Sequence, residues 1–141
     1  MNKLINTLKP ASLVIAYCSA LFSYSALADI AVIANTANAS SSLTVKNVKK
    51  IFLGKDNSMK PIDQSEGNPI RNEFYQKAAK KSESQMKAYW SKMIFSGKAT
   101  PPETSANDAS VTAWVAKNKN GVGYIDSASV DGSVKVLLTI K

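Results

Sequence analysis

Residues 60–71, with the sequence Lys-Pro-Ile-Asp-Gln-Ser-Glu-Gly-Asn-Pro-Ile-Arg, decide the fold because they carry the chain from a strand into a helix. The pattern predicts a strand over Lys60–Gln64 and a turn over Ser65–Asn68. Asn68 is a favoured residue at a helix cap, and Pro69 suits the first helical position, where the N–H that proline lacks would have no partner. A strand that leads through a short turn into a helix is typical of α/β architecture.

The same alternation of strands and helices extends in both directions from this segment. Apolar runs rich in β-branched residues predict strands, and capping residues followed by amphipathic stretches predict helices. The expected elements are a strand over 29–34, a helix from Thr44 to Gly54, the strand over 60–64, a helix from Asn68 to about Lys80, a helix from Ser82 to Gly97, a loop over 98–104, a helix with Ser105 and Asp108 in a capping box, and strands over 121–125 and 133–140. We therefore expect an α/β fold in which helices pack on a small sheet.

The helix predicted from Ser82 to Gly97 carries one apolar stripe. The members of this stripe recur at the spacing of a packed amphipathic helix, so we expect them in the core. They are Met86, Tyr89, Trp90, Met93 and Ile94.

The composition excludes several classes of enzyme. The chain has 141 residues, with 18 Lys plus Arg, 10 Asp plus Glu, one cysteine and no histidine. Without histidine there is no Ser-His-Asp or Cys-His catalytic group and no histidine zinc site, and the lone Cys18 excludes an internal disulfide. The pairs Asp63 with Glu66 and Asp126 with Asp131 lie near predicted turns and are interpreted as solvated surface residues. We predict no enzymatic activity, no cofactor and no metal site.

Residues 1–28 have the pattern of a cleaved signal peptide. Two lysines form a short positive region, Ala11–Phe22 is mostly apolar, and Ala26-Leu-Ala28 places small residues where a signal peptidase cleaves. The alternative is a membrane anchor, but polar residues interrupt the apolar stretch. We expect a periplasmic domain over 29–141 with a formal net charge of +6, obtained by removing two lysines from the +8 of the whole chain, and without stable membrane insertion after cleavage.

The basic residues are almost all lysines, and Arg71 is the only arginine. The lysines are spread over the backs of the predicted helices with few aromatic residues between them. Proteins that bind single-stranded nucleic acid interleave stacking aromatics with positive charge, so we expect no nucleic-acid partner. Only a guanidinium offers a rigid two-pronged donor to phosphate or carboxylate, which makes the position of Arg71 important.

The segment from Ser65 to Arg71 gathers groups that favour an anion. A turn with backbone N–H groups, a capping amide and the only guanidinium lie together at a predicted helix N-terminus, where the helix dipole attracts negative charge. The candidate ligand-binding residues are Ser65, Gly67, Asn68 and Arg71. The alternative is an ordinary helix start with Arg71 bound to a surface carboxylate.

An ordered series of motifs runs along most of residues 29–141. The series comprises Leu43-x5-Lys49-x-Ile51-Phe-Leu-Gly-Lys55, Pro61-Ile-Asp-Gln-x-x-Gly67-x3-Arg71-x2-Phe74, Tyr89-Trp90-x4-Phe95-Ser-Gly97, Pro101-Pro102 and Gly121-Val-Gly-Tyr-Ile125. It resembles the substrate-binding proteins of phosphate ABC transporters and, more narrowly, the short single-lobe members of that family.

This resemblance implies a single lobe of a type II periplasmic binding protein-like fold and, as ligand, weakly bound phosphate or a similar small anion. The family's binding loop has an Arg, then three residues, then Ser-Gly-Thr at a helix start. Here Gln64 occupies the Arg position, and Asn68, Pro69 and Ile70 occupy the other three, so three phosphate-holding groups are absent. The alternative function is a non-catalytic envelope interaction module that kept the lobe and lost the pocket, acting as a homodimer or with an envelope protein partner.

Overall fold

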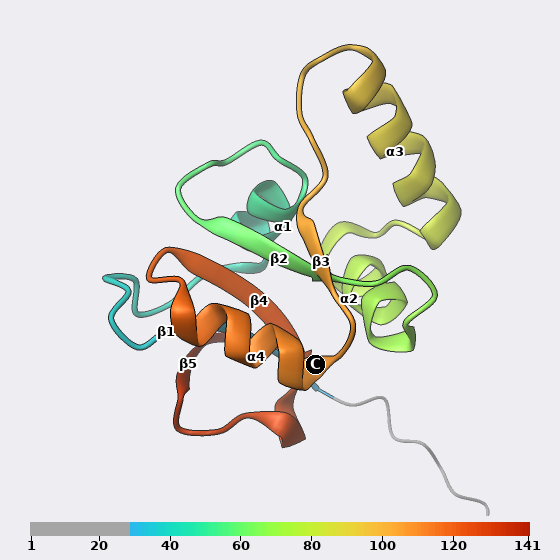
Figure 1. Cartoon of the computed structure of the whole chain (residues 1–141). Coiled ribbons are helices and arrows are strands. Elements are labelled where there is room, and N and C mark those ends of the chain that lie inside the picture. Colours follow the sequence, from blue (N-terminus) through green and yellow to red (C-terminus); the bar gives the residue numbers. More distant parts are fainter. Residues whose placement is uncertain (1–28) are drawn as a thin grey trace, which may run out of the picture.

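The computed structural model describes residues 29–141 and shows a mixed α/β fold (Figure 1). The predicted signal peptide over 1–28 lies outside the described residues. The elements are β1 (Ile30–Asn35), α1 (Val45–Phe52), β2 (Lys60–Gln64), α2 (Pro69–Ala79), α3 (Glu83–Phe95), β3 (Glu103–Ser105), α4 (Asp108–Lys117), β4 (Gly121–Asp126), the short 3-10 helix η1 (Ser127–Ser129) and β5 (Val134–Ile140). The predicted α/β class, with helices packed on a small sheet, is confirmed.

The five strands form one sheet in the order β3-β2-β4-β1-β5. β2 runs parallel to β3 and β4, whereas β1 runs antiparallel to both β4 and β5. β4 and β5, which follow each other along the chain, therefore do not pair with each other, because β1 lies between them. The turn predicted near Asp131 connects two strands that flank a third.

The centre of the sheet is buried on both faces. All six residues of β1 are buried, and the side chains of its first five residues alternate between two apolar clusters. Ile30 and Val32 belong to the cluster with α1, α2 and α3, whereas Ala31 and Ile33 belong to the cluster with α4. Figure 1 shows α4 on one side of the sheet and α1 and α2 on the other. This double burial explains why residues 30–34 of β1 are continuously apolar and do not alternate with polar residues.

Side-chain caps begin the four α-helices. Thr44 and Ser82 cap α1 and α3 as predicted, each within a capping box, and Asn68 caps α2 by accepting a hydrogen bond from a backbone N–H. The prediction for α4 was wrong, because its cap is Asn107, not Ser105. Ser105 is the last residue of β3, where its carbonyl accepts a hydrogen bond from the chain that follows β2.

The strand β3 lies inside a segment whose larger part was predicted to be a loop. Its three residues are polar, and it has no apolar alternation that would indicate a strand. It exists because its backbone pairs in parallel with Ile62–Gln64 of β2. The prediction of a loop over 98–104 was therefore wrong for Glu103 and Thr104.

Helix α3 packs against the apolar cluster that includes α1 and α2 with only part of its length. Met86 and Trp90 are buried, Tyr89 and Met93 are partly buried, and Ile94 is 55% exposed. The prediction that the whole stripe lies in the core was therefore wrong for Ile94. Figure 1 shows the reason, since the C-terminal end of α3 extends away from the other elements. Across residues 29–141, no helix combines the length and the apolar character needed to cross a membrane.

Candidate functional site

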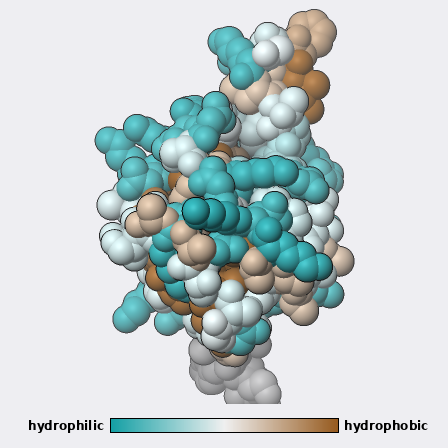
Figure 2. Space-filling model, turned by 60° about the vertical axis from the view of Figure 1, so that its left-hand side comes forward, coloured by the Kyte–Doolittle hydropathy of each residue, from teal (hydrophilic) through white to brown (hydrophobic). Residues whose placement is uncertain are grey.

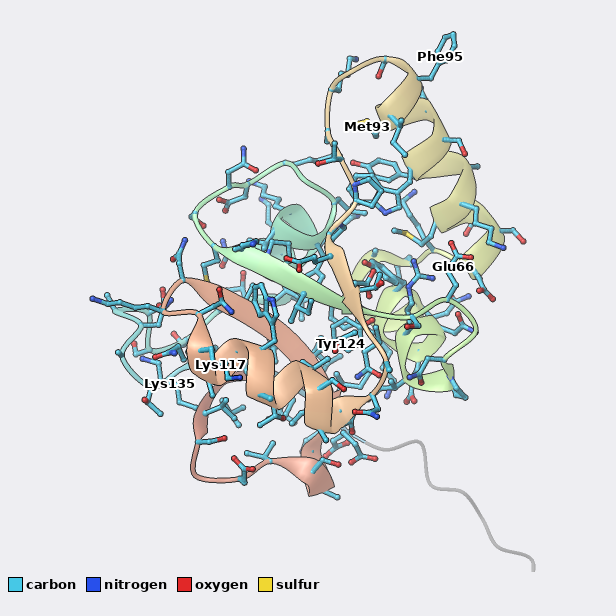
Figure 3. All side chains as sticks on the ribbon, in the orientation of Figure 1. Glu66, Met93, Phe95, Lys117, Tyr124 and Lys135 are labelled. Atoms are coloured by element: carbon cyan, nitrogen blue, oxygen red, sulfur yellow. The ribbon has the colours of Figure 1, made fainter. Side chains whose placement is uncertain are left out.

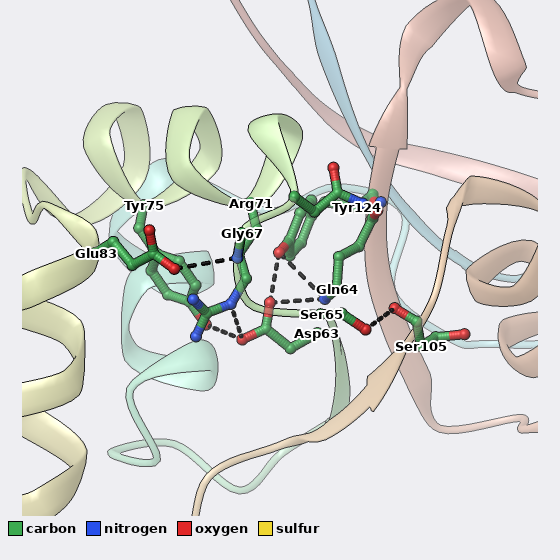
Figure 4. A network of polar contacts seen from close by, with 10 residues as sticks. Asp63, Gln64, Ser65, Gly67, Arg71, Tyr75, Glu83, Ser105 and Tyr124 are labelled. Carbon is green, nitrogen blue, oxygen red and sulfur yellow. Dashed lines mark hydrogen bonds and ion pairs between the residues drawn. The ribbon is translucent and has the colours of Figure 1, made fainter.

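Asp63 forms the centre of a buried polar network at the end of β2. Its side chain is 2% exposed, so the interpretation of this residue as a solvated turn residue was wrong. One carboxylate oxygen accepts hydrogen bonds from the Tyr124 hydroxyl and from the backbone N–H of Gln64 (2.8 Å). The other accepts from the Tyr75 hydroxyl (2.7 Å) and from Nε of Arg71 (3.3 Å), as Figure 4 shows. The burial of this charge is thus compensated by four donors.

Arg71 points into the protein from the first turn of α2. Its residue surface is 5% exposed, its Nε forms an ion pair with Asp63, and its guanidinium carbon lies 5.3 Å from the centre of the Tyr75 ring. Burial, the largest single influence, would lower the pKa of Arg71, but Asp63, Tyr75 and Tyr124 together outweigh it, so the pKa is raised above its ordinary value. The alternative interpretation of Arg71 was correct in giving it a carboxylate partner and wrong in placing that partner at the surface.

The pKa values of the two tyrosines in this network are also strongly shifted. Burial, followed by the charge of Asp63, raises the pKa of both Tyr75 and Tyr124 well above its ordinary value. Both hydroxyls therefore stay protonated and donate to the carboxylate. The network carries one negative and one positive charge, both buried and paired.

Gln64 links the starts of two helices to the sheet. This side chain is fully buried, and its Nε2 donates to Oδ1 of Asp108 (2.7 Å) and to the Tyr124 carbonyl (3.1 Å). Its Oε1 accepts a hydrogen bond from the Asn68 side chain (2.8 Å). The second carboxylate oxygen of Asp108 accepts from the backbone N–H of Asp126 (3.1 Å). The starts of α2 and α4 are therefore held in fixed positions beside the end of β4.

The turn between β2 and α2 uses most of its donors within the protein. Ser65 donates to the Ser105 carbonyl through both its backbone N–H (3.0 Å) and its hydroxyl (3.2 Å). Gly67, which has a φ of +80°, donates its backbone N–H to the Glu83 carboxylate at the start of α3 (3.0 Å). The backbone N–H of Asn68 donates to the Ser65 carbonyl (3.2 Å). The carboxylate of Glu83 therefore already occupies a position at which the sequence predicts an external anion.

The four predicted ligand residues do not face one cavity. Asn68 lies on a cleft of about 920 Å³ between the start of α2, helix α4 and the segment before β5, whereas Arg71 lies on a separate hollow of about 340 Å³ beneath α3. Ser65 and Gly67 form the turn between these two hollows. The residues are close in sequence, but the side chains of Ser65 and Arg71 point in different directions (Figure 4).

The charged side chains that line the larger cleft are mainly acidic. Its polar lining includes Asn68 and Asn107 at the caps of α2 and α4, one basic residue, Lys117, and the carboxylates of Asp108, Asp126 and Asp131. The two helix N-termini favour an anion there, and the three carboxylates oppose it. In residues 29–141, no group of three or more acidic, Cys or His side chains has a geometry that could hold a metal ion.

The buried network was not found from the sequence, although one signal was present. Arg71 and Tyr75 are four residues apart and therefore share one face of α2. The only guanidinium of the chain beside a tyrosine on that face indicates a buried carboxylate partner, and Asp63 at the end of the preceding strand is within reach. Tyr124 could not be added in this way, because it lies 61 residues from Asp63 along the chain.

Comparison with solved structures identifies the fold as that of periplasmic binding proteins. A provisionally assigned phosphate ABC transporter substrate-binding protein from Clostridium perfringens, solved with bound phosphate, matches with a TM-score of 0.63 and 22% identity over 78% of this chain and 45% of its own. An ABC-type phosphate transport receptor from Vibrio cholerae matches with a TM-score of 0.61 and 20% identity, over 78% of this chain and 46% of the receptor. A possible phosphate binding protein from Planctomyces limnophilus gives a TM-score of 0.55 and 16% identity, over 78% and 41%.

These three proteins are binding proteins, and the present chain spans less than half the length of each. No family model matches the chain, and no curated protein matches it in sequence. At these identities the likeness shows the fold: a five-stranded α/β unit of the periplasmic binding protein type.

Proposed function

We propose that this chain is an exported, non-catalytic binding protein that holds phosphate or a similar small anion at the start of α2. The observation that carries the proposal is the position of the cleft, which is lined by the N-terminal ends of both α2 and α4. Such ends present backbone N–H groups and the positive ends of helix dipoles. The choice of ligand is supported by the similar protein from Clostridium perfringens, whose structure contains bound phosphate.

The proposed ligand-binding residues are Ser65, Gly67, Asn68 and Arg71. Asn68 lies on the cleft and offers its side-chain amide, and Gly67 offers a backbone N–H once Glu83 is displaced. Ser65 fixes the turn through Ser105, and Arg71, whose charge is paired with Asp63, joins the first turn of α2 to the end of β2. Residues 1–28 would act as the signal peptide and deliver the domain over 29–141 to the periplasm.

The same geometry makes the proposed binding weak. Pro69 has no N–H, the N–H of Ile70 donates to the Asn68 side chain, and an anion must compete with Glu83 for Gly67. The acidic lining of the cleft also repels the ligand. We expect a dissociation constant between about 10 μM and 1 mM, which corresponds to about 4 to 7 kcal/mol.

The test is a phosphate titration followed by the amide NMR signals of Gly67 and Asn68, with sulfate as a second anion. Asn68→Asp keeps a good helix cap, removes the amide donor and adds a negative charge, so binding should be lost while α2 stays formed. Asn57→Asp is the control, because it adds the same charge at an exposed position outside the cleft. Binding that survives Asn68→Asp, or no shift of either signal at high millimolar phosphate, would refute the proposed site.

A second candidate function is a non-catalytic envelope interaction module. It is favoured by the internal use of the predicted ligand groups, since Arg71 is paired with Asp63 and Gly67 with Glu83. This candidate predicts a homodimer or a stable complex with an envelope protein, formed equally with and without phosphate. Sedimentation of the exported protein with and without phosphate separates the two candidates.

A further inference from the structure

We propose that the end of α3 is a membrane-contact tip that docks this domain on an anionic lipid surface. The tip comprises residues 92–98. This inference is independent of the proposed anion site, because none of these residues lines the cleft at the start of α2.

The first observation is the exposure of large apolar side chains at the tip. Phe95 is 96% exposed and Ile94 is 55% exposed, while the next most exposed large hydrophobic residues, Val45 and Val136, are each at 40%. Figure 3 shows Phe95 pointing away from the protein at the end of α3, whereas Met93 points back toward the chain that follows the helix. Figure 2 shows apolar surface at the extremity of the molecule, with hydrophilic surface beside it. The side chains of Ile94 and Phe95 are therefore available for contact with another molecule or surface.

The second observation is that three backbone carbonyls near the end of α3 accept hydrogen bonds from N–H groups of the tip. The N–H of Ser96 donates to the Lys92 carbonyl (3.0 Å), that of Gly97 to Ile94 (3.0 Å) and that of Lys98 to Met93 (3.1 Å). Carbonyl groups at a helix end are otherwise without partners and would resist transfer into an apolar medium. Because these three carbonyls already accept hydrogen bonds, the tip can enter the boundary between lipid headgroups and acyl chains at a lower cost in free energy.

The third observation is the sign of the charge around the tip. No acidic residue occurs between Glu83 and Glu103, a stretch that contains Lys87, Lys92 and Lys98. Among residues 29–141, neither Lys92 nor Lys98 takes part in an ion pair, and both are exposed. Unpaired lysines beside an exposed aromatic residue complement an anionic surface.

The shape of the tip favours a lipid surface over a protein partner. A stable protein interface covers roughly 800 Å² on each partner and needs a complementary pocket. The tip offers two strongly exposed apolar side chains on a projecting helix end (Figure 1), which is a narrow convex surface. Lipid adapts to such a protrusion without a preformed pocket, and its negative headgroups receive the lysines.

The test is flotation of the exported protein, with its N-terminus established by mass spectrometry, on lipid vesicles. We expect binding to phosphatidylcholine vesicles that contain about 30% phosphatidylglycerol, little binding to pure phosphatidylcholine, and release in about 0.5 M NaCl. Phe95→Ala should weaken binding about tenfold with an unchanged circular dichroism spectrum. Val136→Ala, at the exposed residue of β5, is the control and should bind like the wild type.

A second variant reports insertion directly. Phe95→Trp should show a blue shift of its fluorescence on the anionic vesicles, whereas Val136→Trp should not. The proposal is overturned if the wild type binds neither vesicle, if it binds both equally at low salt, or if Phe95→Ala binds as well as the wild type. It is also overturned if vesicle binding is absent and Phe95→Ala dissociates a dimer in sedimentation, since the tip would then contact protein. A failure of phosphate to bind leaves all these outcomes unaffected.

Discussion

At the end of β2, beside the start of α2, the carboxylate of Asp63 receives four hydrogen bonds, whereas at the end of α3 the ring of Phe95 is left almost entirely in solvent. The first region was predicted to offer polar groups to a ligand, and it uses most of them internally. The second region includes part of a stripe predicted to be core, and it leaves apolar side chains uncovered. The contrast shows that residue type suggests what a side chain can bind, while burial decides whether it is available.

The largest expected effect is the loss of stability in Arg71→Ala. Removing the guanidinium leaves the buried carboxylate of Asp63 without its positive partner, and breaking a buried pair in this way costs about 3 to 5 kcal/mol. Urea denaturation should show this as a lower free energy of unfolding.

Lys87→Ala is the matched control for Arg71→Ala. It breaks the ion pair of Lys87 with Glu66 (3.4 Å), which involves the same turn, but both side chains are 58% exposed. The expected loss is no more than about 1 kcal/mol. Equal losses in the two variants would mean that the buried Arg71–Asp63 pair stabilises the fold no more than the exposed Lys87–Glu66 pair does.

The next effect is a loss of stability at alkaline pH. Burial raises the pKa of Tyr75 and Tyr124 in the folded state above the value of about 10 expected for the unfolded chain. The stability that these protons contribute is fully present below about pH 10 and is lost as pH rises from there toward the folded-state values, because the unfolded state then releases protons that the folded state keeps.

Denaturation curves between about pH 9 and pH 11 measure this dependence. Tyr75→Phe removes one of the two groups and should flatten the decline, although it also lowers stability at neutral pH by removing one donor to Asp63. A slope unchanged by this substitution would contradict the assignment of the alkaline transition to the buried network.

A smaller effect is expected for Glu83→Gln, which should raise the affinity for phosphate. Glutamine keeps an oxygen that can accept the hydrogen bond from Gly67, and it removes a negative charge from the proposed seat of the anion. Two charges about 4 Å apart in water interact by about 1 kcal/mol, so an increase of roughly fivefold follows. Calorimetric titration measures it, and Glu103→Gln, at an exposed residue paired with Lys60, should leave the affinity unchanged.

The smallest effect is the stability of Phe95→Ala. Because this ring is 96% exposed, its removal should change the free energy of unfolding by no more than about 0.5 kcal/mol. Phe74→Ala, at a fully buried ring, should by contrast cost about 3 to 5 kcal/mol. A loss above about 1 kcal/mol in Phe95→Ala would show that the tip packs against the rest of the protein.

The sequence predicts those parts of the fold that depend on local interactions. The caps Thr44, Asn68 and Ser82 bond to backbone groups within the first turn of their helices, so their spacing is visible in the sequence. Strand β3 depends instead on pairing with β2, which lies about 40 residues away. The same pairing removes Ser105 from the start of α4 and leaves Asn107 as the cap.

The candidate site also combines features set by local sequence with features set by packing between distant segments. The turn and the cap at Asn68 were predictable, because they follow from glycine, asparagine and proline in sequence. The partners of that turn were not, since Glu83 and Ser105 reach it only through the packing of α3 and β3. The exposure of Ile94 has the same cause, because helical spacing gives the direction of a side chain and not the extent of the surface beneath it.

The position of β1 has a consequence for folding kinetics. β1 is the first of the described strands along the chain and lies inside the sheet, and its neighbours β4 and β5 are the last two. Ile30 pairs with Asp126 on one side and with Ile140 on the other, so this pairing closes loops of about a hundred residues. Proteins dominated by such distant contacts fold more slowly than helical domains of similar size, because loop closure costs entropy before the contacts compensate for it. A chain growing from its N-terminus therefore cannot close this sheet until β5, residues 134–140, is available.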